Sequence, residues 1–183
     1  RIRRRRADTY SIPTRRKQPR EVNLRPAKAQ ISRSIPRIKI HTMTINEIQD
    51  EIIEEFSLLD DWMDRYQLLI DMGEGEEALP AADKTESNLI DGCQSRVWLV
   101  CDEHDGRLQF RAESDALIVK GIVSLLIRVM TDHTPDEILA ADLYFIDRIG
   151  LREHLSPTRS NGLLAMVKQM RMYALVYKTK AAQ

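Results

Sequence analysis

One run of the sequence is apolar on almost every side when it is wound into a helix. Between Ala116 and Met130 the apolar residues are spaced so that they cover most of the helix circumference: Leu117, Ile118, Ile122, Leu125, Leu126 and Val129. Ser114 or Asp115 can cap the first turn of this helix. We therefore expect residues 116–130 to form the central helix of the core.

A β-hairpin is predicted directly before this helix. Residues 96–101 and 107–112 read as two strands on either side of the segment Glu103-His104-Asp105-Gly106. The Asp-Gly pair in this segment is a signal for a tight turn, so the two strands should pair antiparallel.

A long amphipathic helix is predicted at the start of the patterned region. Thr44 and Glu47 have the spacing of a capping box, and apolar residues follow on one face. This helix should end near Asp71, because Gly73-Glu74-Gly75 interrupts the pattern.

Further helices are predicted towards the C-terminus. Thr134-Pro135-Asp136-Glu137 combines an N-cap with a proline at the first helical position, and Ser156-Pro157 repeats this pattern. A C-terminal helix should follow Asn161-Gly162. The chain is therefore predicted to have an α+β fold in which a small antiparallel sheet packs against several helices.

The first 41 residues differ in composition from the rest of the chain. They contain 14 Lys and Arg residues against two acidic residues, whereas residues 42–183 contain 14 basic and 26 acidic residues. Four prolines and the lack of any helical or strand period predict a disordered basic tail over 1–41, followed by one folded domain over 42–183. A transit peptide, a nucleic-acid-binding arm and an upstream segment foreign to the natural product all fit this tail.

The composition also limits the compartment. No apolar run approaches the roughly 20 residues that span a bilayer, and none resembles a secretory signal. Two cysteines do not make a disulfide framework, which favours a reducing compartment. We expect a cytoplasmic protein, or an organellar one if the tail is a transit peptide, with neither a membrane nor a nucleic acid as its partner.

Cys93 is the strongest candidate for chemistry. It follows Gly92, which allows a tight turn, and it precedes the apolar strand that should anchor the loop. Cys101 and His104 have a spacing that supplies two metal ligands, but a closed zinc site needs four donors, so we assign no metal site and place Cys101 in the core. Cysteine hydrolase chemistry would need a histidine base, for which His154 is a candidate.

The stretch from Asp91 to Leu99 has the sequence Asp-Gly-Cys-Gln-Ser-Arg-Val-Trp-Leu. It resembles the sulfur-acceptor motif of the SufE-like proteins, the persulfide carriers of iron–sulfur cluster assembly. The Ser-Asp-Ala start of 114–121 and the His-Leu-Ser-Pro-Thr-Arg-Ser start of 154–163 resemble two further family motifs, in the same order. The basic tail lies outside the resemblance.

This resemblance implies a SufE/IscU-like fold and a function. Cys93 would accept sulfane sulfur from a SufS-type cysteine desulfurase, stimulate that enzyme and deliver the sulfur to a SufBCD-like scaffold complex. The protein would then be an accessory protein rather than a stand-alone enzyme. It would have no cofactor of its own, because pyridoxal phosphate belongs to the partner and the persulfide on the carrier is transient.

The resemblance also implies that Asp115 and Arg159 face the desulfurase or flank the cysteine loop. Each has a structural alternative, since Asp115 is placed to cap a helix and Arg159 to lie on a helix surface. The direction of the thiol pKa shift stays open, because Arg96 or Arg159 would lower it and apolar neighbours would raise it. Two other functions remain: an iron–sulfur scaffold, for which two cysteines are few, and a cysteine-dependent hydrolase.

Overall fold

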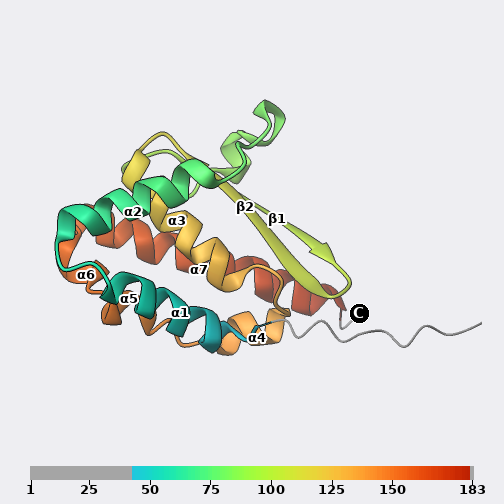
Figure 1. Cartoon of the computed structure of the whole chain (residues 1–183). Helices are drawn as coiled ribbons and strands as arrows, with labels where there is room; N and C mark the ends of the chain where they lie inside the picture. Colours follow the sequence, from blue (N-terminus) through green and yellow to red (C-terminus); the bar gives the residue numbers. More distant parts are fainter. Residues whose placement is uncertain (1–42, 182–183) are drawn as a thin grey trace, which may run out of the picture. The chain divides into compact units, whose positions relative to one another are not determined.

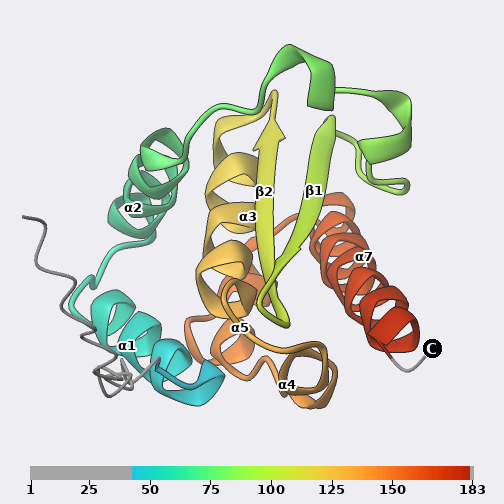
Figure 2. The same cartoon turned by 90° about the vertical axis from the view of Figure 1, so that its right-hand side faces the viewer.

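The computed structural model describes residues 43–181, and the predicted basic tail lies outside them. This part of the chain contains seven α-helices and one hairpin. Figures 1 and 2 show how these elements are arranged. The elements follow in the order α1 (Ile45–Ser57), α2 (Trp62–Gly75), the short 3₁₀ helices η1 (Ala81–Asp83) and η2 (Glu86–Asn88), β1 (Val97–His104), β2 (Arg107–Ser114), α3 (Leu117–Met130), α4 (Pro135–Ala140), α5 (Phe145–Arg148), α6 (Leu151–His154) and α7 (Pro157–Ala181).

The predicted hairpin is confirmed, and it is longer than expected. Strands β1 and β2 pair antiparallel from Val97 opposite Ser114 to His104 opposite Arg107. Asp105 and Gly106 form the two-residue turn with φ angles of 52° and 79°, the left-handed conformation that this tight turn requires. Together with the helices, this two-stranded antiparallel sheet confirms the predicted α+β class.

Helix α3 is the central helix of the core, as predicted. Ten of its 14 residues are buried, and it packs against β2, α2 and α7. The predicted cap is wrong: the N-cap is Ala116, and no side chain caps the helix. Asp115 instead accepts a hydrogen bond from the backbone N–H of Arg96 at 3.0 Å.

The single helix predicted from residue 44 to Asp71 is two helices. The chain leaves α1 after Ser57, and the Asp61 carboxylate caps α2 by accepting from Met63 N–H at 2.9 Å. Periodicity alone did not reveal this break, because the apolar residues stay roughly in phase across it. Helix α2 also continues to Gly75, so it includes Gly73, which was expected to end it.

The glycines in α2 and α3 allow the two helix backbones to touch. A Cβ built on Gly121 would lie 2.0 Å from the carbonyl oxygen of Leu69, and one built on Gly73 would lie 2.8 Å from the backbone nitrogen of Gly121. Gly73 is therefore required by packing between helices. This explains why it does not act as a helix breaker.

Helix α7 covers the free edge of β1 (Figure 2). The hydroxyl groups of Tyr173 and Tyr177 donate hydrogen bonds to the carbonyl oxygens of Leu99 and Cys101, at 3.2 and 3.0 Å. These contacts satisfy strand carbonyls that β2 does not reach, so they protect the edge from pairing with another chain.

Within residues 43–181, every helix is too short or too polar to span a membrane.

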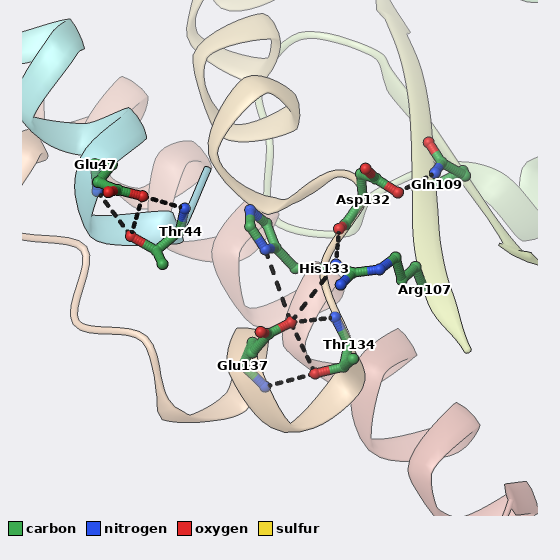
Figure 3. Close-up of polar contacts among 8 residues, drawn as sticks. All are labelled: Thr44, Glu47, Arg107, Gln109, Asp132, His133, Thr134 and Glu137. Atoms are coloured by element: carbon green, nitrogen blue, oxygen red, sulfur yellow. Dashed lines mark hydrogen bonds and ion pairs between the residues drawn. The ribbon is translucent and has the colours of Figure 1, made fainter. Parts of the chain in front are cut away.

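The predicted capping box at Thr44 is present, and the predicted N-cap Thr134 forms a second capping box with Glu137 (Figure 3). The Glu47 carboxylate accepts from the backbone N–H of Thr44 at 2.7 Å, and the Glu137 carboxylate accepts from that of Thr134 at 2.8 Å.

The Glu137 carboxylate also lies 3.8 Å from Nδ1 of His133. The His133 ring is 2% exposed, and its burial lowers the pKa of this histidine below the ordinary 6.5.

Candidate functional site

Cys93 lies in a short loop that is closed at its base. The backbone N–H of Ile90 donates to the carbonyl oxygen of Val97 at 2.8 Å, and Leu89 pairs with Trp98 in an isolated antiparallel bridge. Ile90 and Val97 are both buried. Residues 91–96 therefore leave and re-enter the core at one point, which we call the base of the cysteine loop.

The thiol of Cys93 faces helix α7. Its S–H donates to the carbonyl oxygen of Gly162 at 3.6 Å, and a Cβ built on Gly162 would lie 3.4 Å from the sulfur. Gly92, just before the cysteine, has a φ of 85°, a left-handed conformation that favours glycine. The sulfur is thus turned into the fold and held against a helix position that has no side chain.

The C-terminal helix begins at Pro157, and Gly162 lies inside it rather than before it as expected. Asn161-Gly162 predicts a break in the helical pattern, so the sequence alone does not identify Gly162 as a residue of the site. The signal was ambiguous, because a glycine inside a helical pattern indicates either a helix end or a close approach of another group.

A pocket opens beside the thiol. It has a volume of about 290 Å³. The lining comes from three elements: the cysteine loop with Cys93, Gln94 and Ser95, helix α3 with Val119 and Ile122, and helix α7 with Thr158, Arg159, Gly162 and Met166. Two segments that carry the family motifs, the cysteine loop and the start of α7, therefore meet at one cavity.

Burial decides the electrostatics of the thiol. Desolvation raises the pKa of Cys93 above the ordinary 9.0. The Arg96 guanidinium lies over the Trp98 ring, 5.8 Å from its centroid. Of the two opposing effects that the sequence predicts for the pKa of Cys93, desolvation is the larger one, so the thiol is mostly protonated at neutral pH.

Asp115 supports the end of the cysteine loop. Its carboxylate accepts from the Arg96 N–H at 3.0 Å, and its own N–H donates to the Arg96 carbonyl oxygen at 3.3 Å. Asp115 does not belong to the lining of the pocket, whereas Arg159 does, at its exposed rim. The structure thus brings Arg159 to the thiol pocket and places Asp115 at the loop's downstream anchor.

The other candidate residues lie outside the lining of the Cys93 pocket and make contacts within the fold. Cys101 is buried on the inner face of β1, and desolvation, with a contribution from Asp102, raises its pKa to about 12. The His154 ring stacks on Trp62 at 3.6 Å between centroids, and its Nδ1 lies 3.0 Å from the Gly150 carbonyl oxygen. Within residues 43–181, no group of three or more His, Cys, Asp or Glu side chains is placed to hold a metal ion.

Comparison with known proteins gives a consistent result. Residues 50–174 match the family model of SufE, the Fe–S metabolism associated domain. The chain is 39% identical over 130 residues to an uncharacterized SufE-like protein of Rhizobium meliloti, an alignment that covers 68% of this chain and 93% of that protein. It is 41% identical over 132 residues to an uncharacterized SufE-like protein of Rhizobium etli, covering 69% and 89%.

A solved structure shares the fold. The solution structure of a hypothetical protein from Thermus thermophilus matches with a TM-score of 0.61 at 22% identity, covering 72% of this chain and 96% of the other. At this identity the likeness concerns the fold alone. The family match, which covers more than half of the chain, shows that this protein belongs to the SufE family and that its domain is one associated with iron–sulfur metabolism.

Proposed function

We propose that this protein is a sulfur carrier whose Cys93 accepts sulfane sulfur from a cysteine desulfurase and passes it on for iron–sulfur cluster assembly. In the loading step the Cys93 thiolate attacks the outer sulfur of the desulfurase persulfide. The sulfur–sulfur bond of the donor breaks as a new one forms on Cys93. The donor cysteine leaves as a thiolate, and a proton moves from the carrier thiol to the donor side, so no external oxidant or reductant is needed.

The observation that carries this proposal is the placement of the Cys93 sulfur at the wall of the pocket of about 290 Å³. A water molecule occupies roughly 30 Å³ of liquid volume, so one additional sulfur atom fits in this space. No histidine lines this pocket within the described residues, which favours a carrier over a cysteine-dependent hydrolase.

Transfer requires the sulfur to leave its half-buried position against α7. The hydrogen bond to the Gly162 carbonyl keeps the Cys93 thiol facing inward, and desolvation keeps it protonated by raising its pKa. We propose that the partner moves the cysteine loop about its base and exposes the sulfur. Once the sulfur leaves its half-buried position against α7, the desolvation that raises its pKa is removed, so the thiolate forms where it is needed.

The proposed donor is a SufS-type desulfurase that contains pyridoxal phosphate, and the proposed acceptor is a SufBCD-like scaffold. The carrier itself would hold no cofactor and would raise the turnover of the desulfurase. Arg159, at the rim of the pocket, would contact the desulfurase. Asp115 would act through its hydrogen bonds to the end of the cysteine loop.

Mass spectrometry tests the proposal. The full chain is incubated with a SufS-type desulfurase and cysteine, and its peptides are then analysed without reduction. We expect the mass of one sulfur atom on the peptide that contains Cys93, in the wild type and in Cys101→Ala, and none in Cys93→Ser. Sulfur uptake by Cys93→Ser, or uptake only at Cys101, would overturn the proposal.

A further inference from the structure

An apolar groove lies where α1 ends and α2 begins. It has a volume of about 490 Å³. Three leucines, three carboxylates and one amide line it: Leu58, Leu59 and Leu68, with Glu55, Asp64 and Asp71, and Gln67. The Gln67 amide donates to the Asp71 carboxylate at 2.8 Å, which leaves the second carboxylate oxygen for a ligand. We call this site the α1–α2 groove; none of its lining residues belongs to the Cys93 pocket.

The apolar part of the α1–α2 groove is unusually open to water. Leu58 is 82% exposed, the highest value among the large apolar side chains in residues 43–181, and the neighbouring Met63 is 70% exposed. Isolated exposed leucines are common on protein surfaces, but a concave apolar site beside two such side chains is typical of a binding site.

The charge around the groove is predominantly negative. Residues 45–75 contain ten acidic residues and one basic residue, Arg65. The Arg65 guanidinium faces the protein, where it donates to the carbonyl oxygens of Leu59 and Ile149 at 3.0 and 3.2 Å. Glu55 is paired with Arg128 at 2.7 Å. Asp64 is exposed and makes no ion pair within the described residues, so its charge is available to a ligand.

The acidic residues of α2 have the spacing that a second helix would match. Asp64, Leu68 and Asp71 lie at positions i, i+4 and i+7, which places them along one face over two helical turns, about 10 Å. A partner helix laid along this face would meet a leucine between two carboxylates. A partner helix with one apolar residue between two Lys or Arg residues would complement this arrangement.

We propose that the α1–α2 groove binds a basic amphipathic helix of a partner protein. The apolar face of that helix covers Leu58, Leu59 and Leu68, and its Lys or Arg side chains pair with Asp64 and Asp71. The negative potential of the groove repels nucleic acids and anionic membrane surfaces, which leaves a basic protein segment as the occupant. This binding does not involve Cys93.

Binding of a synthetic probe tests this proposal. The probe is a fluorescently labelled helical peptide with leucines on one face and lysines on the other, and its anisotropy is followed as the full chain is added. We expect saturable binding that weakens about tenfold in Leu58→Ser. We expect a several-fold loss in Asp64→Lys, largest at low salt because the pair is exposed to solvent.

Two matched controls keep the test specific. Leu175→Ser removes an exposed leucine from α7, and Glu86→Lys makes the same charge change away from the groove. Both should bind the peptide like the wild type, as should Cys93→Ser. Absence of saturable binding, or equal losses in the controls, would overturn the proposal. A dimer in sedimentation that Leu58→Ser dissociates would also overturn it, since the occupant would then be a second copy of this chain.

Discussion

The sulfur of Cys93 lies 3.6 Å from the carbonyl oxygen of Gly162, on a helix that could not carry a larger side chain at this position without touching the thiol. This contact joins the cysteine loop to α7 across 69 residues of sequence. It makes the glycine part of the site although it has no functional group. A substitution at Gly162 can therefore affect the proposed sulfur transfer without affecting folding, and the two effects can be measured independently.

Gly162→Ala should leave the fold intact and slow the loading of Cys93. Alanine favours a helix by up to about 1 kcal/mol relative to glycine, so the free energy of unfolding should stay constant or rise. The new methyl group would lie 3.4 Å from the sulfur and occupy space that an added sulfur atom needs. Urea unfolding and the rate of persulfide formation measure the two effects. Gly75→Ala, with no atom within 4 Å of the new Cβ, is the control; equal loading rates in the two variants would contradict the prediction.

Asp115→Ala should release the end of the cysteine loop. The variant loses the acceptor for the Arg96 N–H, at a cost of about 1 kcal/mol in unfolding free energy. Iodoacetamide should then modify Cys93 several-fold faster than in the wild type, because the thiol is exposed more often. Asp115→Asn keeps a side-chain oxygen acceptor and should behave nearly like the wild type. A rate for Asp115→Ala no higher than that of Asp115→Asn would refute this role.

The alkylation rate of Cys93 should keep rising above pH 9.0. Desolvation raises the pKa of this thiol above that ordinary value, so its thiolate fraction increases at a higher pH than that of a free thiol. The measurement uses Cys101→Ala, in which Cys93 is the remaining cysteine, with a cysteine-containing peptide as reference. A midpoint equal to that of the peptide would show that the thiol is not desolvated.

His133 should make the fold less stable as the pH falls from 7 towards 5. Burial lowers the pKa of His133 in the folded protein, so below about pH 6.5 the unfolded chain binds a proton that the folded chain does not. The pKa of Glu137 is lowered, so the stability that it contributes is lost only below its ordinary 4.5. In His133→Gln the unfolding free energy should therefore depend less on pH between 7 and 5. An unchanged slope in urea titrations would contradict this assignment.

Gly121→Ala should destabilise the protein by about 3 kcal/mol. The new Cβ would lie 2.0 Å from the carbonyl oxygen of Leu69, so α2 and α3 would have to separate. Urea unfolding measures the loss, and Gly75→Ala again supplies the control. A loss of less than about 1 kcal/mol would mean that the two helices can shift apart without disturbing the core.

The parts of the fold that were predicted correctly depend on contacts between near neighbours in sequence. Asp105 and Gly106 specify the hairpin turn, and the Thr44–Glu47 and Thr134–Glu137 pairs each specify a helix start within four residues. Such signals are complete in the local sequence. The placement of Cys93 in a loop before a strand follows from the same kind of information.

The errors arise where distant residues decide. Gly73 and Gly162 lie inside helices because another segment passes close to each of them, and neither partner is visible in the local pattern. Asp115 was predicted to cap α3, but its carboxylate is taken by Arg96, 19 residues earlier. The sign of the Cys93 pKa shift likewise depended on which groups the fold gathers around the sulfur.

The Ile90–Val97 hydrogen bond, which closes the base of the cysteine loop, has a consequence for how such proteins diversify. The six residues beyond it can change length or side chains while the hairpin and the central helix keep their contacts. Selection for a different partner can therefore act on this small segment, and new specificities can arise without first finding mutations that restore the stability of the rest.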